Sequence, residues 1–140
     1  MPAIRQVRPL FLFENFCRKN EVDGVPISAV IGDSELELIV LTTPASQEEG
    51  FSKYKPTDIS GLLFIYTEEQ PLNFWMKGVD FPLDIMYFGA DRSLINWTEM
   101  QPEEDHKTIY SSDTPAMFAV EVPAGWCREN GITPGCKLKF

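Results

Sequence analysis

Apolar and polar residues alternate most clearly in the segment ELELIVL, which begins at Glu35 and becomes continuously apolar toward its end. This pattern predicts a strand over residues 35–42 that is half-buried at first and then enters the core. Periodicity before residue 35 is weak and is interrupted by Asp-Gly and Gly-Asp pairs, which favour turns. We therefore treat residues 1–34 as an N-terminal extension without a predicted element.

A helix start follows the predicted strand. Thr43 can cap a helix and Pro44 suits the first helical position. Ser46 and Glu49 offer a second possible capping box. Because the residue before a proline disfavours helical dihedrals, we expect a short helix that ends before Pro56.

Beyond residue 60 the chain is a succession of short β-type runs, separated by links rich in turn-forming residues. Neighbouring runs lie too close together for the dozen or so residues of a parallel crossover, so we expect them to pair as antiparallel hairpins. The predicted fold class is mainly β (α+β), antiparallel, with one or two short helices. The runs are residues 61–66, 72–77, 83–88, 93–98, 117–122 and 136–140.

The length of 140 residues and the hydrophobic content of 44% suit a single domain, residues 1–140, with one core. No apolar run approaches the roughly 20 residues of a spanning helix. Arg5 and Arg8 precede a short apolar run, but Glu14 ends it and no small-residue cleavage site follows. We expect a cytoplasmic protein without a membrane partner.

The formal net charge is -9 at pH 7. Nucleic-acid binding needs a basic surface that releases counterions, so this charge argues against a DNA or RNA partner. The simplest interpretation of the acidity is a solvated surface.

The candidate chemistry is sparse. Cys17, Cys127 and Cys136 form no CxxC motif, so reduced thiols are the default, and a Cys127–Cys136 bridge remains open for an oxidising compartment. His106 is the single histidine and lies in a polar loop, which disfavours triad chemistry. The sequence contains no nucleotide-binding, metalloprotease or EF-hand motif, so we predict no cofactor and no metal site.

The segment NFWMKGVDFPLD places charges among aromatic residues. If residues 72–77 and 83–88 pair across the intervening turn, Lys77 lies opposite Asp84 at the rim of an apolar face. A slip of one residue would turn the two side chains to opposite faces. An unpaired charge in such a place costs several kcal/mol, so each group should meet a partner or water.

Glu121 presents the same problem, since it lies in the apolar run AMFAVEV. Alternation sets Phe118, Val120 and Val122 on one face, and Met117, Ala119 and Glu121 on the other. If the second face is covered, Glu121 needs a partner, for which Lys77 is the nearest candidate by residue type.

Two interpretations of these charged residues compete. In the structural one, Lys77, Asp84 and Glu121 form a polar network that fixes strand register or reaches solvent. In the functional one, they orient a small polar ligand in a cleft walled by Trp75, Met76 and Phe88.

These segments resemble the DUF192 family of small bacterial, archaeal and phage domains of unassigned function. The resemblance rests on GLLFIY before FWMKGVDFPLDIMYF, then on YSSDTPAMFAVEVPAGW and GITPGCKLKF, and covers roughly residues 35–140. It implies a compact, mostly β domain, barrel-like or sandwich-like, with a short helix after the first family strand. The family signature falls on Phe74, Trp75, Met76, Lys77, Pro82, Leu83, Asp84, Glu121 and Gly125.

The chain also departs from the family pattern. Gly78 and Val79 stand where the family usually has Asn-Thr, and Gly135 and Cys136 stand where it has Gly-Asp. The usual arginine of the helix segment is absent from EEGFSKY.

The first functional hypothesis is a non-enzymatic module that binds a small polar ligand or a protein partner through Trp75, Met76, Lys77, Asp84 and Glu121. The alternative is a hydrolase or lyase that uses Lys77, Asp84 and Glu121 as acid and base groups with pKa values shifted by burial. Binding ranks first because the sequence shows no nucleophile and base pair. A structural accessory that presents a strand edge is a third possibility.

Overall fold

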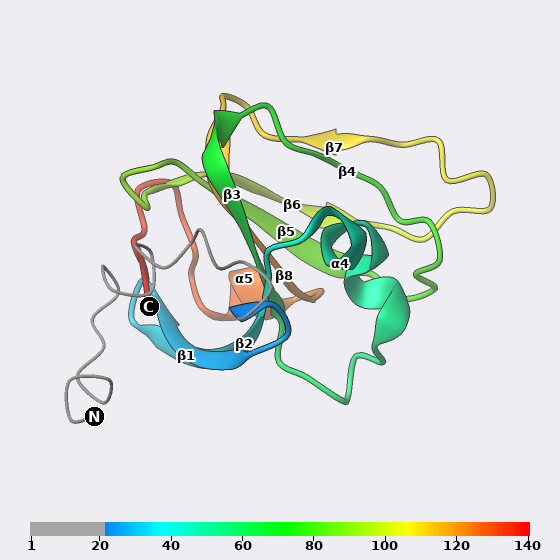
Figure 1. The fold of residues 1–140 in the computed structure, drawn as a ribbon, viewed down its shortest axis with the longest axis horizontal. Coiled ribbons are helices and arrows are strands. Elements are labelled where there is room, and N and C mark those ends of the chain that lie inside the picture. Colours follow the sequence, from blue (N-terminus) through cyan, green and yellow to red (C-terminus); the bar gives the residue numbers. More distant parts are fainter. Residues whose placement is uncertain (1–21) are drawn as a thin grey trace.

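The computed structural model describes residues 22–140 of the chain. Seven strands form one strongly curled sheet with the order β6-β5-β8-β3-β2-β1-β9, and two short strands form a separate β4–β7 ribbon (Figure 1). The predicted mainly β class is confirmed, and the curled sheet has the shape of a half-barrel. The strands are β1 (Pro26–Ile31), β2 (Ser34–Leu41), β3 (Leu62–Gln70), β4 (Asn73–Phe74), β5 (Leu83–Phe88), β6 (Leu94–Met100), β7 (Tyr110–Ser111), β8 (Ala116–Pro123) and β9 (Leu138–Lys139).

The first strand lies in the segment for which the sequence analysis predicted no element. β1 and β2 form an antiparallel hairpin in which Ile31 lies opposite Ser34. Gly32 makes the turn with a φ of 62°, a conformation that glycine adopts without steric cost. The run PISAVI, flanked by turn signals, already carried a strand signal that the weak periodicity obscured. Residues 1–21, with Arg5, Arg8, Glu14 and Cys17, lie outside the described part of the chain.

Strand pairing follows the sequence order less than predicted. β5 and β6 form the expected antiparallel hairpin. The run 72–77, however, pairs with neither of its neighbours, because β4 pairs with β7. β8 lies between β3 and β5 and pairs antiparallel with both. The β4–β7, β3–β8 and β5–β8 pairings each join segments far apart in the sequence. Turn signals between neighbouring runs do not predict such pairings.

A crossover joins β2 to β3, which are parallel neighbours. It contains helix α4 (Pro44–Glu49) and the 3-10 helix η2 (Gly50–Lys53), so the predicted short helix before Pro56 is confirmed. Thr43 is the N-cap, and it forms a reciprocal capping box with Ser46, whereas Ser46 with Glu49 does not form the box.

Polar contacts fix the crossover on the sheet. The Gln47 side-chain amide donates hydrogen bonds of 3.0 Å to the carbonyl oxygens of Leu41 on β2 and Ile65 on β3. Asp23 Oδ1 accepts hydrogen bonds of 2.7 Å from the backbone N–H of Thr42 and the hydroxyl of Ser46. Helix α4 is therefore tied to two central strands and to the segment before β1.

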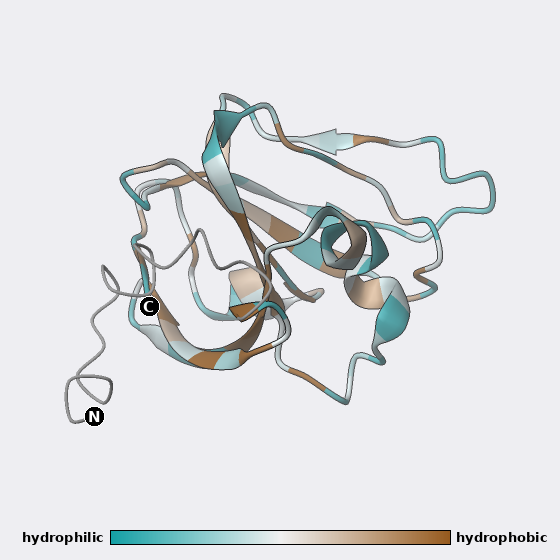
Figure 2. Cartoon of the chain, in the orientation of Figure 1, coloured by the Kyte–Doolittle hydropathy of each residue, from teal (hydrophilic) through white to brown (hydrophobic). Residues whose placement is uncertain are grey.

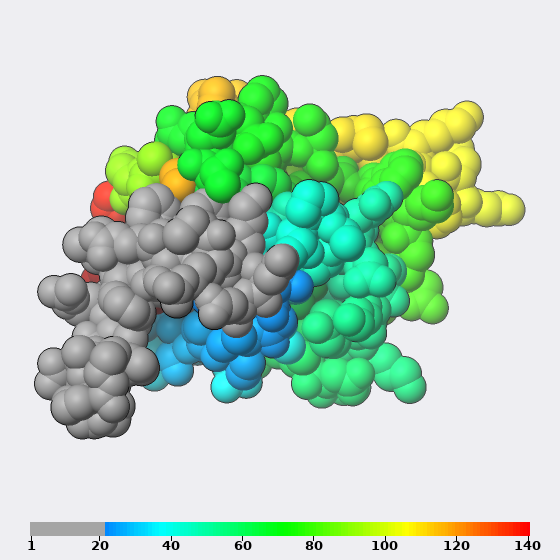
Figure 3. Space-filling model, viewed as in Figure 1, coloured from blue at the N-terminus to red at the C-terminus, as the bar shows by residue number. Residues whose placement is uncertain are grey.

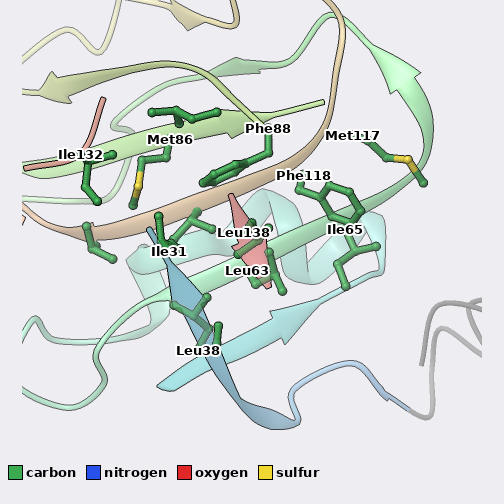
Figure 4. Packing of buried hydrophobic residues seen from close by; sticks show 14 of the residues in the cluster. Ile31, Leu38, Leu63, Ile65, Met86, Phe88, Met117, Phe118, Ile132 and Leu138 are labelled. Atoms are coloured by element: carbon green, nitrogen blue, oxygen red, sulfur yellow. The ribbon is translucent and has the colours of Figure 1, made fainter. Parts of the chain in front are cut away.

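Buried apolar side chains form two clusters, one on each face of the central strands. Figure 4 shows the first, in which Leu38, Leu63, Met86 and Phe118 pack inside the curl. The second cluster packs on the other face and includes Phe51 from η2. Phe118, Val120 and Val122 of β8 belong to the first cluster and Ala119 to the second, as alternation predicts, while Met117 packs with the first. Both faces of β8 are thus covered.

The two edges of the curled sheet approach one another. Ser93, just before β6, makes an antiparallel bridge with Lys137, just before β9. Hydrogen bonds from the Leu94 amide to the Cys136 carbonyl (2.8 Å) and from the Leu138 amide to the Arg92 carbonyl (2.9 Å) extend this contact.

Hydropathy follows the layers. In Figure 2 the central strands carry brown hydrophobic bands, while α4 and the loop between β6 and β7 are largely teal. In Figure 3 this yellow loop projects from the body of the molecule. Within residues 22–140, no helix has the length and apolar character needed to cross a membrane.

Candidate functional site

A cavity of about 310 Å³ lies between the crossover helices and the sheet. Its floor comes from β3 and β8, one side from α4 and η2, and the other from β4 and the residues that follow it. The cavity is therefore formed where the second core cluster reaches the surface. Its lining residues are Pro44, Gln47, Glu48, Glu49, Gly50, Phe51, Phe64, Tyr66, Asn73, Phe74, Trp75, Lys77, Val79 and Glu121.

Glu121 is the buried charged group of this cavity. It lies on β8 opposite Leu62 of β3 and Ile85 of β5, and its side chain is 4% exposed. The backbone amide of Phe51 donates a hydrogen bond to the carboxyl group. Oε1 is buried and has no hydrogen-bond partner within the described residues. Burial raises the pKa of Glu121 to about 8, against the opposing effect of the Phe51 amide.

Gly50 brings the backbone of the crossover close to this carboxyl group. A Cβ at Gly50 would lie 3.4 Å from Oε1 of Glu121 and 3.7 Å from Cζ of Phe64. The φ of Gly50 is 46°, in the region that favours glycine. The sequence therefore places a glycine where the helical segment turns over the buried carboxyl.

Two tyrosines lie near Glu121 on adjacent strands. Burial, and next the charge of Glu121, raise the pKa values of Tyr66 on β3 and Tyr87 on β5. The Tyr87 hydroxyl donates a hydrogen bond of 2.7 Å to the Tyr110 carbonyl, whereas Tyr66 lines the cavity. Both hydroxyls stay neutral at physiological pH, so they do not offset the charge of an ionised Glu121.

Aromatic rings wall the cavity on the side of β4. Phe74 makes edge-to-face contacts with Phe64, at 4.8 Å between centroids, and with Tyr87, at 5.8 Å. Trp75 is 44% exposed at the rim, and the Nζ atom of Lys77 lies 5.3 Å from the centre of its ring. The cavity thus combines one buried carboxyl group with aromatic rings, and its rim is amphipathic.

The predicted pair of Lys77 and Asp84 does not form. β4 ends at Phe74, and a turn follows in which the Val79 amide donates to the Met76 carbonyl. Asp84 lies instead opposite Val122 of β8 and Glu99 of β6. The hairpin prediction is wrong because β8 occupies the edge of β5 that residues 72–77 would have needed.

Asp84 has a separate structural role. Its side chain is 1% exposed, and Oδ2 accepts hydrogen bonds from the backbone amides of Gly125 (3.1 Å) and Cys127 (3.0 Å). These amides open the short helix α5 (Trp126–Glu129). Burial raises the pKa of Asp84, and the two amides oppose the shift. Asp84 does not line the cavity.

Of the predicted site residues, Trp75, Lys77 and Glu121 line the cavity. Met76 and Asp84 do not. Met76 is 1% exposed within the second core cluster. Phe88, expected as a wall of the cleft, belongs to the first core cluster. Lys77 also does not pair with Glu121, because within residues 22–140 no ammonium lies within 4.0 Å of that carboxyl.

Sequence reasoning missed the contribution of the crossover. Gln47, Glu48, Glu49 and Phe51 line the cavity, as does Tyr66. The helix was predicted, but its face toward the sheet depends on the parallel pairing of β2 and β3. Gly50, a residue that favours turns, lies inside the segment predicted to be helical. It was the local sign that the crossover passes close to the sheet.

The cysteines and acidic residues form no further site in the described chain. Cys127 is buried and Cys136 partly buried, and both are free thiols. Within residues 22–140 no group of three or more His, Cys, Asp or Glu side chains is arranged to hold a metal ion.

Fold and cavity define a small, mainly β domain with a pocket beneath a crossover helix. The chain belongs to the DUF192 family, described as "Uncharacterized ACR, COG1430", whose model matches residues 27–140. The match includes β1, so the family portion begins before residue 35. A comparison with curated proteins finds no match.

Two solved structures share the fold. A protein of unknown function from Novosphingobium aromaticivorans is 21% identical, with a TM-score of 0.69 over 82% of this chain and 85% of that one. A proposed transcription regulator from Sinorhizobium meliloti is 24% identical, with a TM-score of 0.73 over 84% of this chain and 95% of that one. At these identities the similarity shows the fold alone.

One departure from the family pattern falls on the cavity. Val79, where a threonine is usual in the family, lines it, and Gly78 before it has a φ of 80°. This wall of the cavity is therefore apolar in the present chain.

Proposed function

We propose that this domain is a non-enzymatic binding module that holds a small polar ligand in the cavity above Glu121. The observation that carries the proposal is the buried Oε1 of Glu121, which has no hydrogen-bond partner in the described part of the chain and lies on the floor of a cavity of about 310 Å³. Ligand sites typically combine mostly apolar walls with a few convergent polar groups. The aromatic walls and the single buried carboxyl fit that description.

Burial of an unpaired carboxyl group is costly, and native structures normally give each buried polar atom a partner. A ligand that hydrogen-bonds Oε1 would supply the missing partner. The stability lost by burying Glu121 is then recovered on binding, which supports a binding role over a purely structural one.

A thermal-shift screen of metabolites tests the proposal, with wild type and Glu121→Gln compared directly. Glutamine keeps the shape of the side chain but cannot ionise. A ligand of the cavity should raise the Tm of wild type and lose most of that effect in Glu121→Gln. Ligands that stabilise both proteins equally would show that Glu121 is not in the site.

Lys77→Ala adds information on the rim. The loss of this ammonium should weaken a ligand with an anionic group at the rim and strengthen one with a cationic group. If a ligand raises the Tm of Lys77→Ala as much as that of wild type, Lys77 is outside the site. The role of Glu121 would be unaffected by that result.

A second candidate function is favoured by the same carboxyl group. A pKa of about 8 is close to the optimum for a general acid or base at neutral pH. An acid/base enzyme would use Glu121 with Lys77 at the rim. Asp84 is no longer a candidate acid or base because it does not line the cavity. Turnover of a screened ligand by wild type, abolished in Glu121→Gln, would establish this alternative.

A further inference from the structure

The balance of charge around the cavity indicates what kind of ligand it accepts. Three carboxyl groups line it, on Glu48, Glu49 and Glu121, against the one ammonium of Lys77. Lys77 is exposed and lies over the ring of Trp75 rather than beside Glu121. Within residues 22–140, the buried carboxyl thus has no cationic side chain beside it.

The free atom on the floor defines the chemistry of the contact. One hydrogen bond from the Phe51 amide reaches the carboxyl, and the buried Oε1 has no hydrogen-bond partner within residues 22–140. A carboxylate oxygen accepts hydrogen bonds, and charged N–H donors make the strongest ones. A primary ammonium provides both the positive charge and the N–H donors.

The walls favour the same ligand. The faces of aromatic rings attract cations, and Phe64, Tyr66, Phe74 and Trp75 line the cavity. The rim already shows this contact, with the ammonium of Lys77 at 5.3 Å from the Trp75 ring centre. A metal ion fits less well, because hard cations need several oxygen ligands and the described residues offer no such cluster.

We infer that the cavity binds a small primary amine in its protonated form, with the ammonium on Oε1 of Glu121 and the carbon chain between the aromatic walls. This inference rests on the proposed binding function and names its ligand class. It excludes quaternary ammonium ligands, which have no N–H to donate to the floor.

The inference sets a direction of pH dependence. A bound ammonium needs Glu121 ionised, whereas in the empty cavity the pKa of this group is about 8. Binding should therefore release a proton and tighten as the pH rises, while a neutral hydrogen-bond acceptor would need the protonated acid and weaken. The other titratable groups that face Glu121 or line the same cavity are Tyr66 on β3, Tyr87 on β5, Glu48 and Glu49 on α4, and Lys77 after β4.

The test uses n-butylammonium as the probe, with n-butanol, butyrate and tetramethylammonium as controls. Affinity is followed by the NMR shift of the Phe51 backbone amide in the full chain. The amine stays protonated up to about pH 9. Between pH 6 and pH 8 its affinity should rise about fifty-fold, following the ionised fraction of Glu121.

Variants assign the effect to the floor of the cavity. Glu121→Gln should abolish the pH dependence and most of the affinity. Glu48→Gln, which removes an exposed charge at the rim, should weaken binding less than threefold and keep the pH dependence. A folded Glu121→Gln variant that binds n-butylammonium as tightly as wild type would overturn the inference.

Two failures are distinguishable. Butanol or butyrate binding that depends on Glu121, with no binding of n-butylammonium, would refute the amine class and retain the binding module. No shift of the Phe51 amide with any probe or screened metabolite would refute both.

Discussion

Gly50, on the 3-10 helix η2, lies directly against the buried carboxyl group of Glu121 on the central strand β8. A Cβ on Gly50 would lie 3.4 Å from Oε1, at the short end of ordinary van der Waals contact. Glycine at this position allows the positive φ with which the crossover passes over the buried carboxyl.

Gly50→Ala should therefore destabilise the domain. With a φ of 46° and a ψ of -137°, Gly50 adopts a backbone conformation that other residues rarely occupy, which costs an alanine about 1–3 kcal/mol. Gly131→Ala is the matched control, since Gly131 has a φ of 62° but no atom within 4 Å of the added Cβ. Urea unfolding should give a larger loss for Gly50→Ala, and equal losses would show that neither the backbone conformation of Gly50 nor its contact with Glu121 adds to the cost of a positive φ.

Glu121 should make stability depend on pH. Its pKa is raised from 4.5 in the unfolded chain to about 8 in the folded one, so the native state binds more protons between these values. The free energy of unfolding is therefore highest below pH 4.5 as far as this group is concerned. It should fall as the pH rises toward 8, by up to about 1.4 kcal/mol per pH unit.

Glu121→Gln should flatten this slope and make the variant more stable than wild type at pH 8. Denaturant titrations from pH 5 to pH 9 measure the effect. Glu48→Gln, on the exposed surface of α4, should keep the wild-type slope. Equal slopes for wild type and Glu121→Gln would contradict the buried, unpaired state of Glu121 in the described chain.

Asp84→Ala should destabilise the start of α5 without changing ligand binding. The change leaves the partly buried amide of Gly125 and the buried amide of Cys127 without their acceptor, and the loss at Cys127 alone is about 1–3 kcal/mol. Asp80→Ala, at an exposed position, should have little effect. Hydrogen exchange at the Cys127 amide reports the local opening, and unchanged protection there would contradict the role given to Asp84.

The two described cysteines should differ in reactivity. Cys127 is buried, and burial together with Asp84 raises its pKa, so little thiolate forms. Cys136 is partly exposed. In a Cys17→Ser background, a thiol reagent should modify Cys136 in the native protein and Cys127 only on unfolding. Equal rates at both thiols would contradict the packing around α5.

Local signals predicted local structure well. The alternation after Glu35 and the cap at Thr43 each act within a few residues, and both are confirmed. Alternation likewise placed Glu121 on the face opposite Val120, where it is buried. What the sequence could not supply was its surroundings, because the crossover that covers it follows from the parallel pairing of β2 and β3.

The failed pairing of Lys77 with Asp84 has the same origin. Adjacent runs with a turn between them favour a hairpin. β8, which begins at Ala116, competes for the same edge of β5 and brings a nearly continuous apolar strand to it. The outcome of this competition depends on the total apolar area that each strand arrangement buries. A short segment of sequence does not determine that area.

The hydrogen bonds by which Gln47 holds α4 bear on how a ligand would enter the cavity. Both ends of the crossover continue into central strands, and the two hydrogen bonds from Gln47 fasten its middle to them. Helix α4 is thus fastened to the two strands that the crossover connects, which favours a cavity that is formed before a ligand arrives. A preorganised site loses little binding free energy to its own ordering, so even a ligand with few atoms can bind to it.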